Sequence, residues 1–521
     1  MAVAGDTDAD VIVIGAGHNG LVTAAYLARF GLRTLLLEAR ASVGGTAASE
    51  PFGGATVNIC NCDHLTFRTT PVMRELDLEA HGLRYLDVDP SQLNMTWDEQ
   101  RPWLSFHDID RTIDGLNMTH PREVEGYRQY LKAALPAVRL VLEGASEPPS
   151  MRGLTRRALD RRMRGVPTLL RWSRRSAADV MRSFFATEPL RAPALAVGPM
   201  VWGISPETPG SGLGALTYAM RHVAKVGRPV GGSGAVPEAL LASFLAAHGT
   251  LRTSSRVSTI VCDSTGVRGV SLDDGTEIRA DIVVSACDPH RTFVEWLKGA
   301  PTQADDLINR WRTIPHSQGY ESKIDAVLTE IPRLLATQTA DFERLGVDPA
   351  ACTAAIAPSL ADMDRGQRLM NRGQILDRPG FLVNVPTVMD PTMAPDGRHV
   401  LSLEAIYTPY DFTGGWTDTA EPQRWLDQFA SITAPGFRDS IVDWRVMTPA
   451  SYESEFNLPK GHATSFAGGP LAAMRNKNPE LTRYETAVRG LYLTGAATFP
   501  GAGVWGASGR NAATVVLRSL P

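Results

Sequence analysis

A short apolar run, a helical pattern and a second apolar run open the chain. Residues 11–14 are four apolar, mostly β-branched residues in succession, which predicts a strand buried on both faces. Residues 21–30 place Leu21 and several alanines on one face of a helix, and Gly31 follows as a helix-ending residue. Residues 33–37 predict a second strand. Together these patterns predict a βαβ unit.

The same two periodicities predict further elements along the chain. We expect strands at residues 251–252, 257–263, 267–272, 277–280, 281–285, 322–328, 381–386, 399–407 and 441–447. We expect helices at residues 122–144, 215–226, 237–248, 332–336, 423–432 and 510–519. Pro136 lies inside the first of these helices, where it predicts a kink or a split. A strand and a glycine-rich loop within residues 490–509 return the chain to the first βαβ unit.

Three glycines and one acid occupy positions in this unit that carry chemistry. Gly15, Gly17 and Gly20 follow the first strand in the spacing G-x-G-x-x-G, and Glu38 ends the second strand. The first glycine allows a tight turn, the second lets a pyrophosphate approach the helix N-terminus, and the third lets helix and strand pack closely. A carboxylate at position 38 can accept hydrogen bonds from a ribose diol. The unit predicts a site for an ADP-containing dinucleotide. The alternative is a βα turn without a ligand, and in that case the three glycines and the acid would occupy these positions by chance.

A glycine pair after the acid distinguishes between NAD and FAD, the two dinucleotides that such a unit can bind. Gly44 and Gly45 follow Glu38 by six and seven residues, where a simple NAD-binding fold would begin another βαβ element. A tight glycine pair at this point indicates that the backbone passes close to a bulky cofactor. FAD extended along its full length fits that requirement.

Composition narrows the class of protein. The 521 residues are enough for two domains, and 43% hydrophobic and 21% charged residues are ordinary for a globular chain. The net charge of −4 provides no global field for nucleic acid. The first ten residues lack the basic and apolar regions of a secretory signal, and no apolar run approaches the length of a membrane span. We expect a cytoplasmic protein without a nucleic-acid partner.

The cysteines and the absent motifs favour redox chemistry without a metal. The five cysteines are odd in number and sparse, which favours free thiols in a reducing compartment. Cys60-Asn61-Cys62 is too closely spaced for a usual zinc site and has no His or Cys pair at ligand spacing, so we interpret it as structural or pocket-lining. No G-x-S-x-G, H-E-x-x-H or P-loop motif is present. We therefore predict no metal.

Residues 152–182 form an unusually basic segment. They hold ten arginines against two aspartates, with leucines, Met163 and Trp172 between them. A basic amphipathic segment can lie on an anionic membrane surface or form a solvated helical face, and we favour the solvated face. If the segment instead lies on a membrane surface, the protein is cytoplasmic with peripheral membrane contact.

Three blocks of the sequence resemble the phytoene-desaturase-like flavoproteins of the amine-oxidase and glutathione-reductase-like FAD superfamily. They are VIVIGAGHNGLVTAAYLARFG with LLLEARASVGGT, GGSGAVPEALLASFLAAHGTLRTSSRVSTIV with DIVVSA, and GLYLTGAATFPGAGVWG. Within this group the chain is most similar to the branch whose members are named for a pyridine-nucleotide-disulfide-oxidoreductase domain. The resemblance implies FAD as the cofactor.

The resemblance also implies roles for individual residues. It assigns Gly15, Gly17 and Gly20 to the pyrophosphate and Glu38 to the adenosine ribose. The other implied contacts are Gly44, Gly45 and Thr46 along the FAD path, Val257 at the adenine, Gly495 and Ala496 near the phosphate and ribityl chain, and Gly503, Val504 and Trp505 beside the flavin ring. Many relatives have arginine where this chain has Thr46, which alters the contacts expected near the flavin.

The implied fold is α/β, with a discontinuous Rossmann-like FAD domain of glutathione-reductase type and a mixed-sheet substrate domain with a helical insertion. We expect the FAD domain to comprise residues 1–70, 228–295 and 485–521. The substrate domain then comprises residues 71–227 and 296–484, with the helical and basic insertion at about residues 122–182.

Two histidines are candidates for the base that takes a proton during flavin chemistry. His64 follows the glycine pair in NICNCDHLTF, and His462 lies in a glycine-containing loop before the C-terminal block. The alternative for His64 is a histidine satisfied by backbone partners. An aromatic group fits either an apolar pocket or ordinary core; its members are Tyr407, Tyr410, Phe412 and Trp416.

Three functions fit these features. We favour an FAD-dependent desaturase or dehydrogenase that takes a hydride from an apolar or amphiphilic small molecule to flavin N5. An amine or amino-acid oxidase that produces hydrogen peroxide would require a lysine near N5, for which Lys323 and Lys460 are available. A flavin-dependent isomerase without net redox change is the third. A homodimer is compatible with all three.

Overall fold

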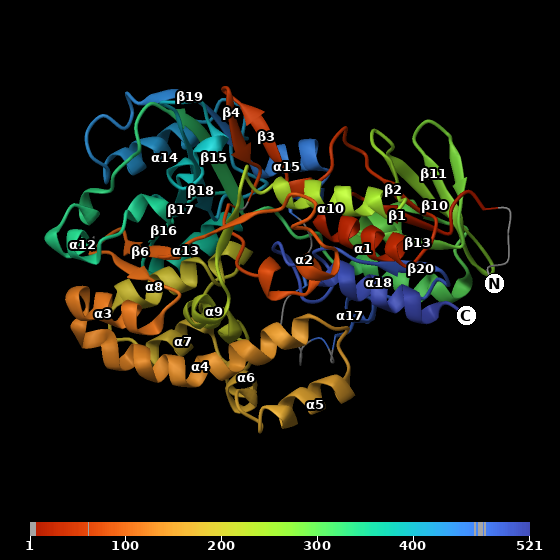
Figure 1. The fold of residues 1–521 in the computed structure, drawn as a ribbon, viewed down its shortest axis with the longest axis horizontal. Helices are drawn as coiled ribbons and strands as arrows, with labels where there is room; N and C mark the ends of the chain where they lie inside the picture. The colour runs from red at the N-terminus through yellow and green to blue at the C-terminus, as the bar shows by residue number, and fades with distance from the viewer. Residues whose placement is uncertain (1–6, 61, 100, 463–464, 467–472, 474–475) are drawn as a thin grey trace.

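The computed structural model describes residues 7–60, 62–99, 101–462, 465–466, 473 and 476–521. In Figure 1 the chain forms two lobes around two separate sheets, with a group of helices below the left-hand lobe. The first strand of the described chain and the C-terminal helix lie together in the right-hand lobe. Among the described residues, no helix is both long enough and apolar enough to cross a bilayer.

A five-stranded parallel sheet forms the core of the right-hand lobe. Its order is β20-β13-β1-β2-β9. The strands are β1 (Val11–Ile14), β2 (Thr34–Leu37), β9 (Thr250–Arg252), β13 (Ile282–Ser285) and β20 (Leu491–Leu493). They come from three separated parts of the chain, and every pairing between them is parallel. All residues of β1 and β2 are buried, as expected for strands covered on both faces.

Three helices and a smaller sheet complete this lobe. Helix α1 (His18–Arg29) packs between α10 (Ala235–Ala246) and α18 (Ala507–Ser519) on one face of the parallel sheet (Figure 1). The smaller sheet has the order β12-β11-β10-β14. Its strands are β10 (Val257–Asp263), β11 (Gly266–Leu272), β12 (Glu277–Arg279) and β14 (Leu297–Lys298).

A seven-stranded mixed sheet forms the core of the left-hand lobe. Its order is β19-β15-β18-β17-β16-β6-β7. The strands are β6 (Gln92–Thr96), β7 (Trp103–Ser105), β15 (Glu321–Leu328), β16 (Thr353–Ala357), β17 (Gly380–Asn384), β18 (His399–Ile406) and β19 (Ile441–Met447). One face of this sheet carries apolar residues such as Ile324, Leu403 and Phe381, which belong to a core cluster with Trp425 of α14 (Glu421–Ala430).

A helical group lies below the seven-stranded sheet (Figure 1). Its helices are α3 (Ile109–Thr119), α4 (Val124–Ala145), α5 (Met151–Asp160), α6 (Val166–Trp172), α7 (Ala177–Arg182), α8 (Glu188–Ala196) and α9 (Thr217–Val223). Helix α4 continues through Pro136 without a split. Helix α9 is shorter than the predicted span of 215–226, because the chain then enters β8 (Gly227–Pro229), which pairs with β5 (Tyr85–Asp87).

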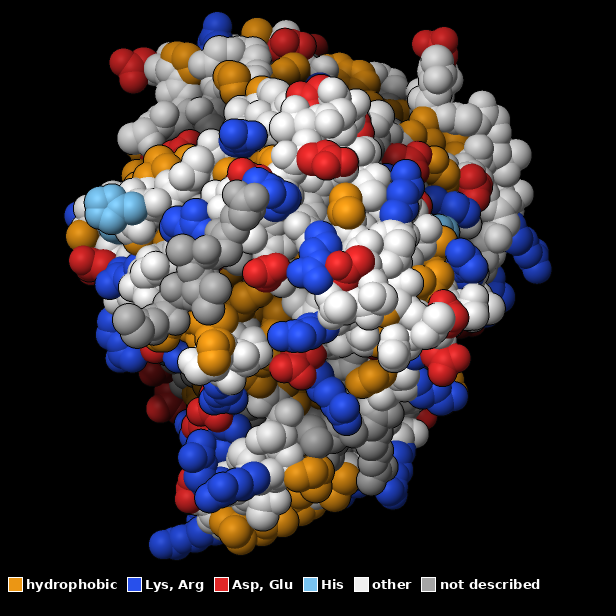
Figure 2. Space-filling model, turned by 90° about the vertical axis from the view of Figure 1, so that its right-hand side faces the viewer, with side chains coloured by type: hydrophobic (Ala, Val, Ile, Leu, Met, Phe, Trp, Pro, Cys, Tyr) orange, Lys and Arg blue, Asp and Glu red, His pale blue; other side chains and the backbone are white. Residues whose placement is uncertain are grey.

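The basic segment of residues 152–182 spans α5, α6 and α7. Several of its arginines are paired with acids, including Arg157 with Glu147 and Arg161 with Glu143. The segment also exposes apolar side chains, namely Leu159, Met163 and Leu170, and Met151 directly before it is exposed as well. Blue and orange side chains accordingly mix at the lower end of the molecule in Figure 2, the end at which Figure 1 places α5. Membrane contact by this segment stays a prediction.

The remaining regular elements are short. They are β3 (Ser49–Phe52), β4 (Ala55–Asn58), α2 (Val72–Glu75), α11 (Asp305–Thr313), α12 (Ala340–Leu345), α13 (Leu360–Met370), α15 (Pro449–Phe456) and α17 (Glu480–Arg483). The helix predicted at residues 332–336 is wrong, because Leu334 instead forms a β-bridge with Thr433 and only a 3₁₀ turn, Leu335–Thr337, follows.

Candidate active site

Two glycine loops meet at the C-terminal edge of the parallel sheet. The Gly15 N–H donates to the Leu37 carbonyl at 2.8 Å, and the Gly44 N–H donates to the Ala16 carbonyl at 2.8 Å. Gly15 and Gly44 have φ values of +95° and +111°, which favour glycine. A Cβ on Gly20 would lie 1.9 Å from the Gly15 carbonyl oxygen, so close packing of α1 on this turn requires glycine.

Gly17 differs from Gly20 because its surroundings are open. A Cβ on Gly17 would meet no protein atom within 4 Å. Gly17 is the N-cap of α1, where no side chain caps the helix and the first turn contains no acidic residue. The positive end of the helix therefore faces open space, which suits the pyrophosphate of a dinucleotide.

Glu38 is held at the end of β2 by the backbone of both flanking loops. Its carboxylate accepts hydrogen bonds from the Ala16 N–H at 2.8 Å and from the Arg40 N–H at 2.9 Å. A carboxylate has about four acceptor positions, so two remain for a ligand hydroxyl. The carboxylate is fixed next to the opening of α1, as a ribose contact requires.

A third loop, from the end of the chain, closes on the first two. The Asn19 Oδ1 accepts from the Gly509 N–H at 3.2 Å, and the Thr23 hydroxyl donates to the Gly509 carbonyl at 3.0 Å. The Gly495 N–H donates to the Ser508 hydroxyl at 3.1 Å. The N-termini of α1 and α18 are thereby joined, although they lie at opposite ends of the sequence.

These loops line one continuous cleft. Ten of the predicted cofactor residues lie on its wall: Gly15, Gly17, Gly20, Glu38, Gly44, Gly45, Thr46, Val257, Gly495 and Ala496. The cleft therefore combines an open helix N-terminus, a fixed carboxylate and backbone that can be approached closely. This donor set fits the AMP half and the pyrophosphate of FAD.

The other three predicted cofactor residues lie beyond this wall. Gly503 is exposed and has a φ of +97°. Val504 is buried, and its carbonyl accepts from the Thr66 hydroxyl at 3.1 Å. Trp505 is half-buried, and its carbonyl accepts from the Thr70 hydroxyl at 3.3 Å. The chain from 58 to 70 is thus attached to the loop that the resemblance assigns to the flavin ring; we call it the connecting segment.

The connecting segment also lies against the seven-stranded sheet. The Lys323 ammonium on β15 donates to the Asn58 carbonyl at 2.6 Å. Asp63 accepts from Arg228 at 2.9 Å and from the Thr353 hydroxyl at 2.6 Å. One stretch of chain therefore touches both the C-terminal glycine loop and the substrate sheet.

The sheet face beneath this segment is polar. In the register of β15 with β18, Lys323 is opposite Glu404, and Asp325 is opposite Ser402. Opposed residues in a sheet point to the same side, so these groups share one face with Glu321, two residues before Lys323. Lys323 and Asp325 are buried and form an ion pair. We call this surface the polar face.

Two carboxyl groups on the polar face are half-buried and sparsely bonded. Glu321 accepts a weak hydrogen bond from the Cys60 thiol at 3.6 Å. Among the described residues, no hydrogen bond reaches the Glu404 carboxylate. Burial, together with the charge of Glu321, raises the pKa of Glu404 to about 8. Burial likewise raises the pKa of Glu321, so this pair holds a proton near neutral pH.

An apolar region borders these carboxyl groups. Leu382 of β17 is opposite Glu404 and therefore faces the same side of the sheet. Leu382, Leu65 and Trp505 are half-buried and pack against the core of the helical group. The surfaces around the connecting segment thus combine an apolar part with a proton-holding polar end.

His64 is bonded through both ring nitrogens. Nδ1 lies 2.8 Å from the Tyr85 hydroxyl, and Nε2 lies 2.8 Å from the Ser233 hydroxyl. The side chain is buried, and this burial lowers its pKa to about 3. The partners of the ring are side-chain hydroxyls and not the backbone groups that the alternative interpretation expected. Through Ser233, His64 links the connecting segment to the loop before α10. Its role as a base stays a prediction.

His462 has a different environment. It is half-buried, and its ring lies 4.9 Å from the Tyr320 ring, measured between centroids. Burial lowers its pKa to about 4. No hydrogen bond to its ring is present among the described residues, and its role as a base stays a prediction.

The aromatic group that follows β18 belongs to the packing of the domain. The Tyr407 hydroxyl donates to the Ile204 carbonyl at 2.7 Å, and its ring lies in the core of the helical group. Phe412 and Trp416 stack with ring centroids 4.8 Å apart. Trp416 in turn contacts the buried Trp425. These contacts favour the ordinary-core interpretation for Tyr407, Phe412 and Trp416.

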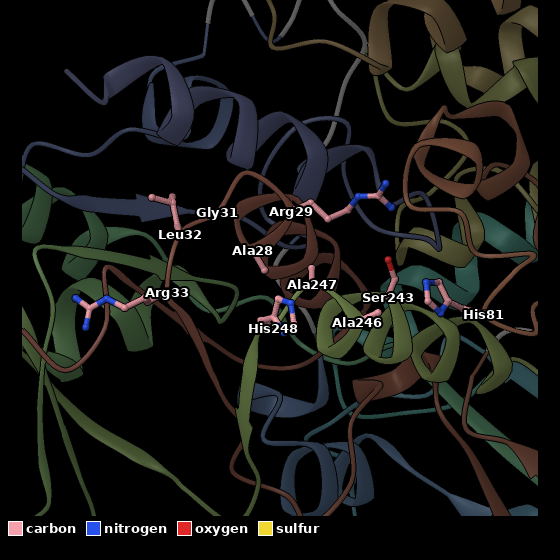
Figure 3. A pocket seen from close by; sticks show the side chains of 10 residues that line it. All are labelled: Ala28, Arg29, Gly31, Leu32, Arg33, His81, Ser243, Ala246, Ala247 and His248. Atoms are coloured by element: carbon pink, nitrogen blue, oxygen red, sulfur yellow. The ribbon is translucent and has the colours of Figure 1, made fainter. Parts of the chain in front are cut away.

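A separate hollow lies at the other end of α1. Its lining includes Arg29, Arg33, Ser243 and His248. Figure 3 shows the Arg29 and Arg33 side chains extending in opposite directions. The basic groups do not converge on one point, so this hollow lacks the fixed polar groups of the glycine-lined cleft.

Sequence reasoning missed four residues near the site. His18 contacts the Gly503 backbone, and burial lowers its pKa to about 4. Its position as the first residue of α1, inside the glycine motif, was the available signal. The other three are Glu321, Glu404 and Cys60, whose thiol is oriented toward Glu321. Their proximity depends on the pairing between distant strands, for which the local sequence carries no signal.

Comparison with known proteins identifies the family. The model of the family described as flavin containing amine oxidoreductase matches residues 20–292. The chain belongs to this family. It is 29% identical to rat pyridine nucleotide-disulfide oxidoreductase domain-containing protein 2, covering 98% of this chain and 94% of that protein. It is 25% identical to a lycopene-forming phytoene desaturase from Pantoea ananas, covering 97% of this chain and 98% of that protein.

A solved structure shows the same fold at low sequence identity. Cyclohexylamine oxidase from Brevibacterium oxydans IH-35A superposes with a TM-score of 0.60 and 16% identity, covering 98% of this chain and 99% of that one. The predicted resemblance and the α/β fold class are confirmed. This flavin amine oxidoreductase family member is an FAD-dependent oxidoreductase.

Proposed function

We propose that this oxidoreductase is a dehydrogenase or desaturase for an amphiphilic small molecule. The single observation that carries the proposal is the pairing of Glu404 with Leu382 across the polar face. It puts a proton-holding carboxyl group next to a half-buried apolar side chain. A substrate with a long apolar part and one polar end matches both.

The cleft residues would hold the cofactor and the connecting segment would separate it from the sheet. Gly17 and Glu38 would bind the pyrophosphate and the ribose, as their open and fixed positions suit. FAD, when bound, supplies the acceptor for a hydride. Trp505 and Leu382 would bind the apolar part of the substrate and exclude water.

The Glu321–Glu404 pair would manage the proton. Removal of a hydride from a C–H group leaves a proton to be taken from a neighbouring atom. A carboxyl group with a pKa of about 8 is partly ionised near neutral pH and can both accept and release a proton. His64, with both nitrogens engaged, would position the connecting segment instead.

The relatives support this class. The phytoene desaturase that covers nearly the whole chain is named for the removal of hydrogen from a substrate. An amine oxidase is the alternative, and it calls for a lysine near N5. Lys323 is engaged with the Asn58 carbonyl and with Asp325, which favours a structural role for its ammonium group. A flavin isomerase remains the third hypothesis.

Reoxidation of the reduced flavin tests the proposal. The FAD-loaded protein is photoreduced without oxygen and then mixed with oxygen or with a quinone. We expect slow reoxidation by oxygen and a marked acceleration by the quinone. Rapid reoxidation by oxygen with stoichiometric hydrogen peroxide would replace the proposal with the oxidase alternative.

Binding of a model amphiphile tests the substrate site. Dodecanol and dodecane are titrated into the FAD-loaded protein, and the visible flavin spectrum is recorded. We expect dodecanol to perturb the spectrum at lower concentration than dodecane. Glu404→Leu should weaken dodecanol binding by about tenfold, corresponding to the loss of one hydrogen bond. Glu455→Leu, at an exposed position of α15, is the matched control and should bind as the wild type does.

A further inference from the structure

Three potential metal ligands meet between the two sheets. Asp288 follows β13 of the parallel sheet, and His290 lies two residues later. His316 lies in the chain that joins α11 to β15 of the seven-stranded sheet. The ligand atoms of these three residues lie within 4.8 Å of one another. No metal was expected from the sequence, because it contains no motif with metal-ligand spacing; the fold brings these residues together.

His290 has one ring nitrogen committed and the other available. Nε2 lies 2.6 Å from the Ile314 carbonyl, which can only accept, so Nε2 carries the hydrogen. Nδ1 is buried without a hydrogen-bond partner, in a side chain that is only 4% exposed. The ring is held edge-on to Trp311, with centroids 5.1 Å apart. Metal-binding histidines are commonly fixed in this way, through a hydrogen bond from the second nitrogen to a carbonyl.

The available nitrogen points at a carboxylate. His290 Nδ1 lies 3.5 Å from Asp288 Oδ1. This separation exceeds the usual N–H···O range of about 2.7–3.2 Å. Two ligands of one tetrahedral zinc ion, at bond lengths of about 2.0–2.2 Å, are separated by about 3.4 Å. The observed spacing therefore suits two ligands of a shared cation better than it suits a direct hydrogen bond.

His316 can supply the third ligand. Its ring stacks on that of His290, with centroids 4.0 Å apart and planes inclined by 29°. The side chain is exposed, so it can turn its nitrogen toward the other two ligands without disturbing the core. Two imidazoles and one carboxylate favour zinc and similar transition metals over magnesium or calcium.

We propose that Asp288, His290 and His316 bind a zinc-like divalent transition-metal ion, with a fourth position left to solvent. The ion would join the end of β13 to the chain that enters β15, and thus tie the parallel sheet to the seven-stranded sheet. Asp288 also lines the FAD cleft, so the ion would sit beside the cofactor site. This site does not depend on the proposed dehydrogenase reaction.

Zinc titration of the FAD-loaded, chelator-treated protein tests the proposal by calorimetry. We expect one equivalent of zinc to bind the wild type, and His316→Ala to weaken this binding by at least tenfold. His81→Ala, a half-buried histidine outside the cluster, is the matched control and should bind as the wild type does. A Cys60→Ser/Cys62→Ser variant should also keep the zinc, which excludes thiol binding as its source.

Thermal unfolding gives a second readout. Zinc should raise the unfolding temperature of the wild type and of His81→Ala but leave that of His316→Ala unchanged, because a ligand stabilises only the state that binds it. Flavin content and unfolding without zinc establish that His316→Ala is folded. Absence of zinc binding by the wild type, or equal binding by His316→Ala, would overturn the proposal.

Discussion

The two large sheets of this protein serve their sites in different ways. In the parallel sheet, β1 and β2 are buried throughout, and the cofactor cleft at the strand ends is lined by the glycines of several loops together with Glu38. In the seven-stranded sheet, one face is apolar and the other carries Lys323, Asp325 and Glu404. The first sheet offers shape and backbone N–H groups, whereas the second offers side-chain charge.

This difference predicts how each site responds to substitution. A site built from glycines should lose its ligand when a side chain fills the space, with little effect on folding. A site built from buried charges should lose stability when one charge is left without its partner. Four measurements test this contrast.

The largest effect is expected from breaking the ion pair on the polar face. Lys323→Met leaves Asp325 buried, and Arg445, at 3.3 Å, is then its one ion-pair partner among the described residues. We expect a loss of about 3–5 kcal/mol in the free energy of unfolding, measured by denaturant titration. The double variant Lys323→Met/Asp325→Leu should recover most of it. Equal stability of the single variant and the wild type would contradict the contrast.

Filling the open space beside α1 should remove the cofactor. A Cβ on Gly17 has no protein neighbour within 4 Å, so Gly17→Ala should leave the unfolding of the cofactor-free protein unchanged. We expect FAD affinity to fall by about 100-fold, or about 3 kcal/mol, because the methyl group occupies the pyrophosphate path. Flavin fluorescence on titration measures this. Gly20→Ala, which clashes with backbone, should in contrast destabilise the cofactor-free protein as well.

The carboxyl group of Glu404 should make stability depend on pH. Its folded pKa of about 8 lies above its ordinary value of 4.5, so between these values the folded state binds more protons than the unfolded state. Stability should therefore fall as pH rises from about 4.5 to 8. Glu404→Gln should show a weaker dependence, because only Glu321 of the pair still titrates, and should unfold at a higher temperature than wild type at pH 8.5. Parallel pH profiles for the two proteins would contradict the assignment.

The smallest effect is expected from breaking an ion pair at the surface. Arg161 and Glu143 in the helical group form an ion pair, and their side chains are 33% and 42% exposed. Arg161→Ala should cost no more than about 1 kcal/mol, measured by the same denaturant titration as Lys323→Met. A cost as large as that of Lys323→Met would show that burial does not explain the contrast.

The cofactor end was predictable because its signals are local. The spacing of Gly15, Gly17 and Gly20 and the acid at position 38 lie within one βαβ unit, and backbone conformation dictates these residue types. The last loop, from Gly495 to Trp505, was placed only through its resemblance to a family. The bonds from Gly509, in the helix that follows this loop, to Asn19 and Thr23 join distant parts of the chain and follow from the fold.

The substrate end was less predictable because its signals are long-range. The strand containing Lys323 was predicted, but which strand lies beside it determines whether Lys323 faces Glu404 or solvent. His64 lies between Tyr85 and Ser233, and neither contact follows from the NICNCDHLTF stretch. Pairing between strands that are far apart in sequence sets these environments, and periodicity within one strand does not report it.

The bond between Thr23 and Gly509 spans 486 residues of sequence, and it has a consequence for synthesis of the protein. During translation, the glycine turn at Gly15 emerges before the seven-stranded sheet, and the loop that closes on it emerges only after that whole sheet has been made. The nascent chain therefore cannot complete its cofactor cleft until the residues around Gly509 have left the ribosome. Capture of FAD is then a late event, and a ribosome-stalled chain truncated before Gly495 should emerge without flavin.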